Sequence, residues 1–329
     1  IFNKESARKG LGAPRRDSSK IAGTNPCGEI FLRNGGLCNL TEVVIREDDT
    51  LDSLLDKVEI ATALGTIQST FTDFHYVRDL WRENAEEERL LGVSLTGIFG
   101  NELTNGKKGK RALKTALTEM KLHAINVNAD LADRMGINHS AAITCVKPSG
   151  TASLLTYASS GIHPWHDKFY LRTIRATKGA PMADFLIDQG VPVEQSQRKD
   201  EELVFTFPVK APEDAVVKSD ISALEHLDIW LSYKKYWTEH NPSVTIDYKP
   251  EEWIEIGAWV LEHWEDVGGL SFLPLDDNVY QQAPLQSVTE TDYNQFLADS
   301  GYPTAIDWDD LVLYEQEDTT TGSQQLACV

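Results

Sequence analysis

An amide, a thiol and a carboxylate occupy alternate positions in one short stretch of the chain, at Asn25, Cys27 and Glu29. Pro26 and Gly28 lie between them and disfavour a regular helix. In an extended or looped backbone alternate residues project to the same side, so the three side chains could face one small ligand. A neighbouring carboxylate raises a thiol pKa and suppresses the thiolate. The pattern therefore favours a cysteine that loses a hydrogen atom rather than a proton, with the glutamate acting separately as a base.

The stretch Asn-Pro-Cys-Gly-Glu, with a second cysteine eleven positions after the first, closely resembles the active-site loop of ribonucleotide reductases. It is most similar to the loop of the adenosylcobalamin-dependent, or class II, branch. The resemblance continues through 147–153 (Lys-Pro-Ser-Gly-Thr-Ala-Ser) and 161–164 (Gly-Ile-His-Pro), and more weakly at 280–284 (Tyr-Gln-Gln-Ala-Pro). It covers nearly the whole chain, and the combined motifs are highly specific.

The resemblance implies a role for each residue of the loop. Cys27 would become a thiyl radical that abstracts the ribose 3′ hydrogen, Glu29 would take the 3′-hydroxyl proton, and Asn25 would hydrogen-bond the same region. The site must hold these atoms tightly and exclude water. Cys38 would be one of two thiols that deliver reducing electrons and close to a disulfide, its partner lying on an N-terminal half. A structural Cys27–Cys38 disulfide is the alternative, and it would consume the radical site.

A second motif consists of small residues that follow a predicted strand. Such residues free backbone N–H groups to point at an anion, although Pro-Ser-Gly is also an ordinary turn. The motif is similar to the substrate-phosphate loop of the family, which implies phosphate binding, with Lys147 a weaker candidate. The predicted phosphate-binding residues are Ser149, Gly150, Thr151, Ala152 and Ser153.

Other cysteines and histidines receive more ordinary interpretations. Cys145 lies in an apolar run and is predicted to be a buried structural thiol. His163 and His166 flank a proline and are predicted to be structural, without a metal. Cys328 resembles the shuttle cysteine of the family's flexible C-terminal tail; the family has two cysteines there, whereas this chain ends one residue after the first.

The radical source implied by the resemblance is adenosylcobalamin. The glycyl-radical branch needs a glycine loop near the C terminus and usually lacks the loop glutamate, and the branch with a radical-generating partner subunit carries a Tyr-Tyr pair that this sequence lacks. The alternatives are a class I-type large subunit that needs such a partner, a split half that is inactive without its N-terminal part, and a plain thiol–disulfide protein. A dithiol reductant such as thioredoxin and the N-terminal half are the expected partners.

Composition limits the other possibilities. The 329 residues carry a net charge of −20, and no Lys or Arg follows Lys249, which argues against a nucleic-acid polymer as partner. No apolar run is long enough to cross a bilayer, and no signal-peptide pattern is present. Four cysteines without a secretory signal indicate a reducing compartment, so we expect a cytoplasmic protein. The chain starts within the family sequence without a methionine and is expected to be the C-terminal part of a longer protein.

Hydrophobic periodicity predicts strands that alternate with helices, and hence an α/β protein with a mostly parallel sheet. The predicted helices are 51–74, 111–135, 221–239 and 251–264, and the predicted strands are 141–146, 203–207, 243–248 and 270–273. The resemblance implies the second half of a ten-stranded α/β barrel around a central, cysteine-bearing finger loop. The expected organisation is a barrel domain over 1–314, with the active-site loop at 24–40, and a flexible redox tail over 315–329.

Overall fold

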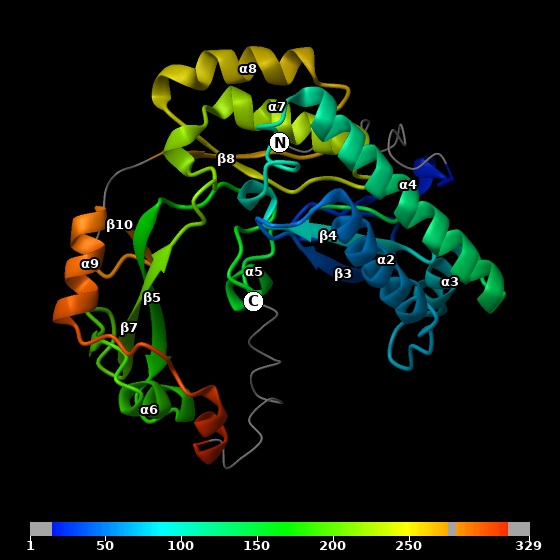
Figure 1. The fold of residues 1–329 in the computed structure, drawn as a ribbon. Helices are drawn as coiled ribbons and strands as arrows, with labels where there is room; N and C mark the ends of the chain where they lie inside the picture. Colours follow the sequence, from blue (N-terminus) through cyan, green and yellow to red (C-terminus); the bar gives the residue numbers. More distant parts are fainter. Residues whose placement is uncertain (1–14, 276–280, 315–329) are drawn as a thin grey trace. The chain divides into compact units, whose positions relative to one another are not determined.

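The computed structural model describes residues 15–275 and 281–314 and divides the chain into two compact units (Figure 1). Each unit has its own hydrophobic core. The first unit comprises Ile1–Trp165 and Pro212–Asp276. The second unit comprises His166–Ala211 and Asp277–Val329. The predicted catalytic and phosphate-binding residues that are described all lie in the first unit.

Extended segments run parallel through the first unit. β3 (Asn39–Val44) pairs in parallel with β4 (Leu91–Thr96) along its full length. The segment 142–146 follows on the other side of β4, because the Val93 N–H donates to the Ile143 carbonyl at 2.8 Å. The predicted strand 141–146 is thus an extended segment joined by isolated bridges rather than by a continuous ladder.

The same parallel order continues towards the end of the first unit. A parallel bridge joins Val146 to Pro242, and the Ser243 N–H donates to the Val146 carbonyl at 2.8 Å. The chain then enters β8 (Thr245–Tyr248), which pairs in parallel with β9 (Ser271–Pro274). The order is therefore β3, β4, the 142–146 segment, β8 and β9, as βαβ connections produce.

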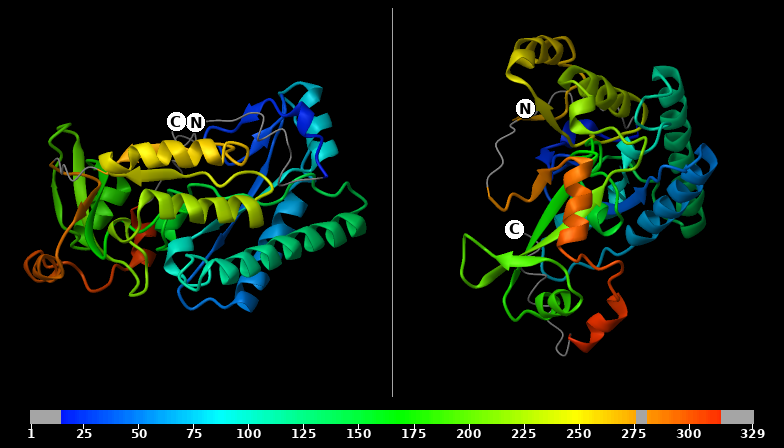
Figure 2. Two further views of the ribbon diagram at one scale, coloured as in Figure 1. Left: turned by 90° about the horizontal axis from the view of Figure 1, so that it is seen from above. Right: turned by 60° about the vertical axis from the view of Figure 1, so that its left-hand side comes forward.

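Capping residues mark the start of α2 and the end of α4. Thr50 and Ser53 form a capping box at the start of α2, and Gly136 ends α4 in the left-handed conformation with φ 67°. The helices of this unit are α2 (Leu51–Gln68), α3 (Asp79–Glu88), α4 (Lys110–Met135), α5 (Ala152–Leu155), α7 (Ala223–Tyr236) and α8 (Trp253–Glu262). Figure 2 shows α8 (yellow) alongside α7 (yellow-green). The four predicted helices are confirmed, although their ends differ, most of all for α2, which ends at Gln68 instead of the predicted 74.

Shorter elements complete the first unit. Two two-residue strands, β1 (Gly23–Thr24) and β2 (Phe31–Leu32), form an antiparallel hairpin. The 3-10 turns are η1 (Ser18–Lys20), η2 (Ile98–Gly100), η3 (Lys218–Asp220) and η4 (Pro250–Glu252).

The second unit is antiparallel. Its strand order is β10 (Leu285–Ser287), β5 (Phe169–Thr177), β7 (Glu202–Lys210) and β6 (Val193–Gln195). The helical elements are α6 (Pro181–Asp188), α9 (Glu290–Asp299) and η5 (Trp308–Leu313). The predicted strand 203–207 lies in β7, but it does not belong to the expected parallel sheet. The connection from β6 to β7 is too short for a parallel crossover, so these strands must form a hairpin.

Among the residues that the structure describes, no helix is both long and apolar enough to pass through a lipid bilayer.

The packing of α2 gives a first prediction. Leu54 is 0% exposed in the core, whereas Leu64 of the same helix is 57% exposed. Leu54→Ala is expected to lower the free energy of unfolding by about 2–5 kcal/mol through lost burial and a cavity. Leu64→Ala, the control, should change it by no more than about 0.5 kcal/mol. Chemical denaturation of both variants measures this, and equal losses would contradict the packing described for α2.

Candidate active site

The predicted reactive loop is the connection of the β1–β2 hairpin. Asn25 closes this loop from within, because its N–H donates to the Ile30 carbonyl at 3.1 Å and its Oδ1 accepts the Ile30 N–H at 3.0 Å. The Gly28 N–H donates to the Asn25 carbonyl at 3.0 Å, and Gly28 turns the backbone with φ 80°. The left-handed region is accessible to glycine without a steric cost, so this turn explains the Gly of the motif.

The three alternate side chains of the loop differ in exposure. Cys27 is exposed, Asn25 is half-buried and Glu29 is 0% exposed. Neither carboxylate oxygen of Glu29 has a hydrogen-bond partner within the described residues. The loop thus presents a surface thiol beside an enclosed carboxylate whose hydrogen-bonding capacity is unused.

Cys38 lies close to this carboxylate in an apolar environment. It packs against a small buried cluster that contains Ile30 and Cys145. Burial, and then the negative charge of Glu29, raise the pKa of the Cys38 thiol well above its usual range. A Cβ built at Gly92 would lie 3.2 Å from the Cys38 Sγ, so glycine leaves room for the thiol. Cys38 is therefore held as a protonated thiol.

Cys145 is confirmed as a buried thiol, and burial raises its pKa as well. Cys27, Cys38 and Cys145 are all free, so the alternative of a Cys27–Cys38 disulfide is not the state of this structure. Cys328 and the tail over 315–329 lie outside the described residues, and their redox role remains a prediction.

The predicted phosphate loop turns part of its polar groups inward. Ser149 is buried, adopts φ 56°, and donates its Oγ–H to the Glu42 carboxylate. Ser153 is buried too, and its N–H donates to the Ser149 carbonyl at 3.1 Å. Gly150 and Thr151 are exposed between them. Gly150 and Thr151 are therefore the exposed part of the loop. Ala152, the first residue of α5, is half-buried.

Glu42, on β3, is a residue that the sequence did not single out. Burial raises the pKa of its carboxyl, and the hydrogen bond from Ser149 opposes that effect. The Ser94 Oγ donates to Glu42 at 3.4 Å and accepts the Lys147 N–H at 2.9 Å. Glu42 and Ser94 thus connect β3 and β4 to the start of the phosphate loop.

The Gly-Ile-His-Pro motif supports this loop from the other side. Gly161 has φ 51°, and a Cβ there would lie 2.4 Å from the Lys147 carbonyl oxygen, so no other residue fits. His163 lies 2.8 Å from the Ser160 carbonyl through Nδ1 and accepts the Thr245 N–H through Nε2 at 2.9 Å. Both ring nitrogens of His163 are thus engaged. The described residues contain no group of three potential metal ligands.

A buried ion-pair cluster anchors the hairpin and was not predicted. The Arg16 guanidinium donates to both carboxylate oxygens of Glu88, at 2.6 and 3.1 Å, and to the Phe31 carbonyl at 2.7 Å. Arg33 also pairs with Glu88, at 3.2 Å, and with Glu87 at 3.0 Å. Long-range pairs of this kind have no local sequence pattern.

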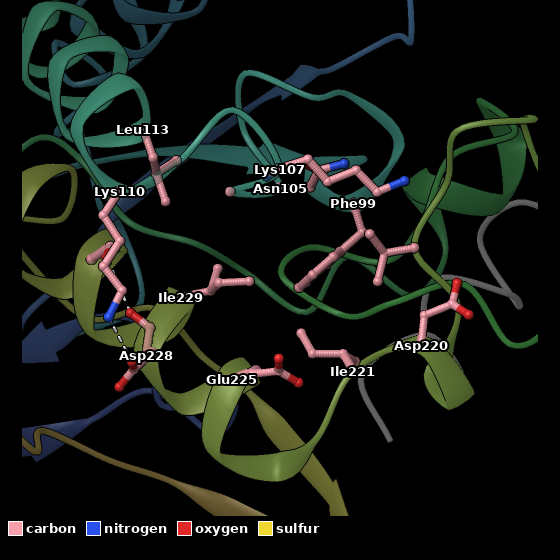
Figure 3. Close-up of a pocket in the computed structure, with 13 residues that line it drawn as sticks. Phe99, Asn105, Lys107, Lys110, Leu113, Asp220, Ile221, Glu225, Asp228 and Ile229 are labelled. Carbon is pink, nitrogen blue, oxygen red and sulfur yellow. Dashed lines mark hydrogen bonds and ion pairs between the residues drawn. The ribbon is translucent and has the colours of Figure 1, made fainter.

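A separate pocket of about 450 Å³ lies between the start of α4 and α7 (Figure 3). Phe99, Ile221 and Ile229 contribute apolar side chains, and an ion pair of 2.8 Å joins Lys110 to Asp228 at one end. None of the sequence-predicted site residues lines it.

One further motif falls in the second unit. Tyr280 lies outside the described residues, whereas Gln282 is buried with φ 58°. The Gln282 side chain accepts the Gln197 N–H at 3.0 Å and donates to the Gln195 carbonyl at 2.8 Å. These bonds give Gln282 a structural role in its unit.

The fold and the loop together define an α/β protein with parallel strands, helical cover and a thiol-bearing hairpin loop hydrogen-bonded beside them. Comparison with known proteins identifies its relatives. The chain is 27% identical over 338 residues to an adenosylcobalamin-dependent ribonucleoside-triphosphate reductase of Levilactobacillus brevis, covering 92% of this chain and 45% of that protein. It is 29% identical over 302 residues to the protein of that name from Euglena gracilis, covering 90% and 40%. No family model matches the chain.

A solved structure shares the fold. The crystal structure of a B12-dependent, class II ribonucleotide reductase matches with a TM-score of 0.73 at 23% identity, covering 94% of this chain and 44% of the other. The alpha subunit of a class Id ribonucleotide reductase from Actinobacillus ureae matches less closely, with a TM-score of 0.55. The chain is thus similar along most of its length to adenosylcobalamin-dependent ribonucleotide reductases, the resemblance that its motifs predicted. It spans less than half the length of these relatives.

The anchor of the hairpin gives a second prediction. Glu88→Gln removes a charge whose side chain is 2% exposed and leaves two buried guanidinium groups incompletely paired. We expect this variant to lose about 3–5 kcal/mol of unfolding free energy. The neighbouring Glu87→Gln is the control, because that side chain is 54% exposed and its pairs are worth at most about 1 kcal/mol. Urea denaturation of the two variants should differ clearly, and similar curves would refute a buried anchor.

The raised pKa of Glu42 gives a third prediction. The Glu42 carboxyl binds a proton more tightly in the folded chain than in the unfolded chain, where its pKa is the ordinary 4.5. The contribution of this group to the free energy of unfolding therefore falls as the pH rises above 4.5. Glu42→Gln lacks this pH-dependent contribution. As the pH is raised from 4 to 7, the free energy of unfolding of the variant should therefore increase relative to that of the parent, by about 1.4 kcal/mol per unit of pKa difference. The exposed Glu47→Gln is the control. Thermal unfolding at several pH values tests the sign, and parallel pH profiles for parent and Glu42→Gln would reject it.

Proposed function

We propose that this chain is the part of an adenosylcobalamin-dependent ribonucleotide reductase that carries the reactive thiol and the catalytic base. The complete enzyme would replace the ribose 2′-hydroxyl of a ribonucleoside di- or triphosphate by hydrogen. The observation that carries the proposal is the exposed Cys27 beside the buried Glu29, which lacks a partner in the described structure, with a protonated thiol at Cys38. The names of the relatives agree with this activity.

The loop residues take three roles in this proposal. Cys27, as a thiyl radical, removes the 3′ hydrogen atom of the ribose and later returns it. Glu29 accepts the 3′-hydroxyl proton, for which its free carboxylate oxygens are suited. Asn25 uses its Oδ1 to close the loop, so its Nδ2–H is the donor with which it would bind the same hydroxyl region.

The reduction requires two further thiols. The 2′ oxygen leaves as water and a hydrogen is added at C2′, so the two thiols give up two electrons and two hydrogens and close to a disulfide. Cys38 is proposed as one of them, and its raised pKa supports a thiol that donates hydrogen rather than one that acts as a thiolate nucleophile. The second would belong to the remainder of the enzyme. A dithiol reductant such as thioredoxin would restore the pair, with Cys328 as the proposed shuttle.

Substrate phosphates are proposed to bind at 149–153. The exposed backbone at Gly150 and Thr151 can offer N–H groups to an anion, while Ser149 and Ser153 hold the turn from inside. A negative charge at the nearby Glu42 would oppose phosphate binding, and burial raises the pKa of this carboxyl because it disfavours the charged form.

Adenosylcobalamin, when bound, supplies the radical that takes the hydrogen atom from a thiol. The exposure of Cys27 at the loop tip fits this requirement, because the sulfur is accessible from outside the chain. The parallel segments of the first unit are consistent with half of a ten-stranded barrel, completed by an N-terminal half, around a finger loop. Three free thiols are consistent with the proposed reducing, cytoplasmic environment.

Electron paramagnetic resonance after rapid mixing tests the proposal. The complete enzyme is mixed with adenosylcobalamin, a ribonucleotide and dithiothreitol. The parent and the matched control Cys145→Ala should both give a cobalt(II) signal coupled to a thiyl radical, and Cys27→Ala should lose the coupled signal. Glu29→Gln should keep the signal and lose about 10²–10⁴-fold in turnover, as expected for a removed general base.

Other results would redirect the proposal. Deoxynucleotide formed without a cobalt signal, and only after another protein is added, would favour the class I-type enzyme with a partner subunit. Absence of both signal and product in the parent would reject the activity. A coupled signal that persists in Cys27→Ala would reject Cys27 as the radical residue.

A further inference from the structure

Three consecutive carbonyl groups of the reactive loop are hydrogen-bonded by one short segment far along the chain. The Ser243 Oγ–H donates to the Cys27 carbonyl at 2.6 Å. The Asn241 Nδ2–H donates to the Gly28 carbonyl at 3.1 Å, and the Asn241 backbone N–H donates to the Glu29 carbonyl at 3.0 Å. The main chain on both sides of the Gly28 turn is therefore held from outside the loop.

The same segment is bound on its other side to the strand that leads into the phosphate loop. The Val146 N–H donates to the Asn241 carbonyl at 3.3 Å, and the Ser243 N–H donates to the Val146 carbonyl at 2.8 Å. The Trp230 indole N–H fixes the residue between them by donating to the Pro242 carbonyl at 2.7 Å. The segment 241–243 thus connects the reactive loop on one side to the strand before Lys147 on the other.

Close packing holds Asn241 in this position. Its side chain is 1% exposed, and a Cβ built at Gly268 would lie 2.6 Å from the Asn241 Oδ1 and 2.8 Å from a ring carbon of Phe31. Glycine at 268 is thus required for the Asn241 amide to fit between this backbone and the hairpin. The amide can then direct its Nδ2 at the Gly28 carbonyl.

We propose that Asn241 and Ser243 are positioning residues that fix the distance between the Cys27 thiol and the substrate held at 149–153. They act through the backbone carbonyl groups of the loop and not through the side chains of Cys27 and Glu29. The consequence for turnover rests on the proposed reductase function, whereas the consequence for loop order does not. Substrate binding and loop position involve different groups. Loss of the hydrogen bonds from Asn241 and Ser243 to the loop is therefore expected to lower kcat and leave KM unchanged.

Ser243→Ala is the main test, because Ser243 is only half-buried and its removal should leave the fold intact. Ser232→Ala is the matched control, since the Ser232 hydroxyl donates to the Asp228 carbonyl of its own helix at 3.0 Å. Hydrogen exchange of the loop peptide, followed by mass spectrometry, should be about two- to tenfold faster in Ser243→Ala and unchanged in Ser232→Ala, as one lost hydrogen bond predicts. In the complete enzyme kcat should fall by a similar factor with KM unchanged, and Ser243→Thr, which keeps the hydroxyl, should restore both readouts.

Asn241→Asp gives a second, stronger perturbation, because it replaces the donor to the Gly28 carbonyl by an acceptor of equal size. Faster exchange together with a kcat loss in Ser243→Ala supports the proposal. Unchanged exchange, or faster exchange with an unchanged kcat, overturns it. A parent enzyme with no reductase activity would instead refute the proposed function, and the exchange measurement would still decide whether the segment holds the loop.

Discussion

Burying a polar group that has no hydrogen-bond partner is unfavourable, and the Glu29 side chain is such a group within the described structure. The loop can retain it because the backbone is held independently of the side chain: the Glu29 carbonyl accepts the Asn241 N–H, and the Cys27 carbonyl accepts the Ser243 hydroxyl. These main-chain bonds leave both functional side chains available for a ligand. The proposed reductase chemistry would require this division of roles, since each reacting atom has to be placed before the substrate arrives.

The hairpin that carries the loop is held at its base by a different kind of interaction. Arg16 binds both oxygens of Glu88 and the carbonyl of Phe31, and so connects the strand after the loop to the end of α3. Bidentate arginine–carboxylate pairs are directional and therefore specify orientation. Two attachments, one at the base through charge and one at the tip through backbone carbonyls, define the hairpin more completely than its two-residue strands can.

The electrostatic environment of Cys38 determines which kind of chemistry suits its thiol. Cys38 is surrounded by apolar side chains, and the nearby negative charge of Glu29 raises its pKa further. Enzymes that use cysteine as a nucleophile do the opposite and stabilise the thiolate with positive charge. A thiol that stays protonated beside a carboxylate fits hydrogen-atom and proton donation, which is the chemistry proposed for this loop.

The sequence by itself determined which proteins the chain resembles, which residues are candidates for the reaction, and four of the helices, because those features are encoded by local chemistry: the Asn-Pro-Cys-Gly-Glu motif, the apolar period of α2 and the Gly136 stop. Tertiary structure alone decided that Glu29 is enclosed while Cys27 is exposed, since burial depends on what packs over a residue. It also decided that β7 is antiparallel, and that residues 241–243 hold a loop more than two hundred positions away. Contacts over such separations leave no periodic pattern in the chain, and only folding brings their donors and acceptors together.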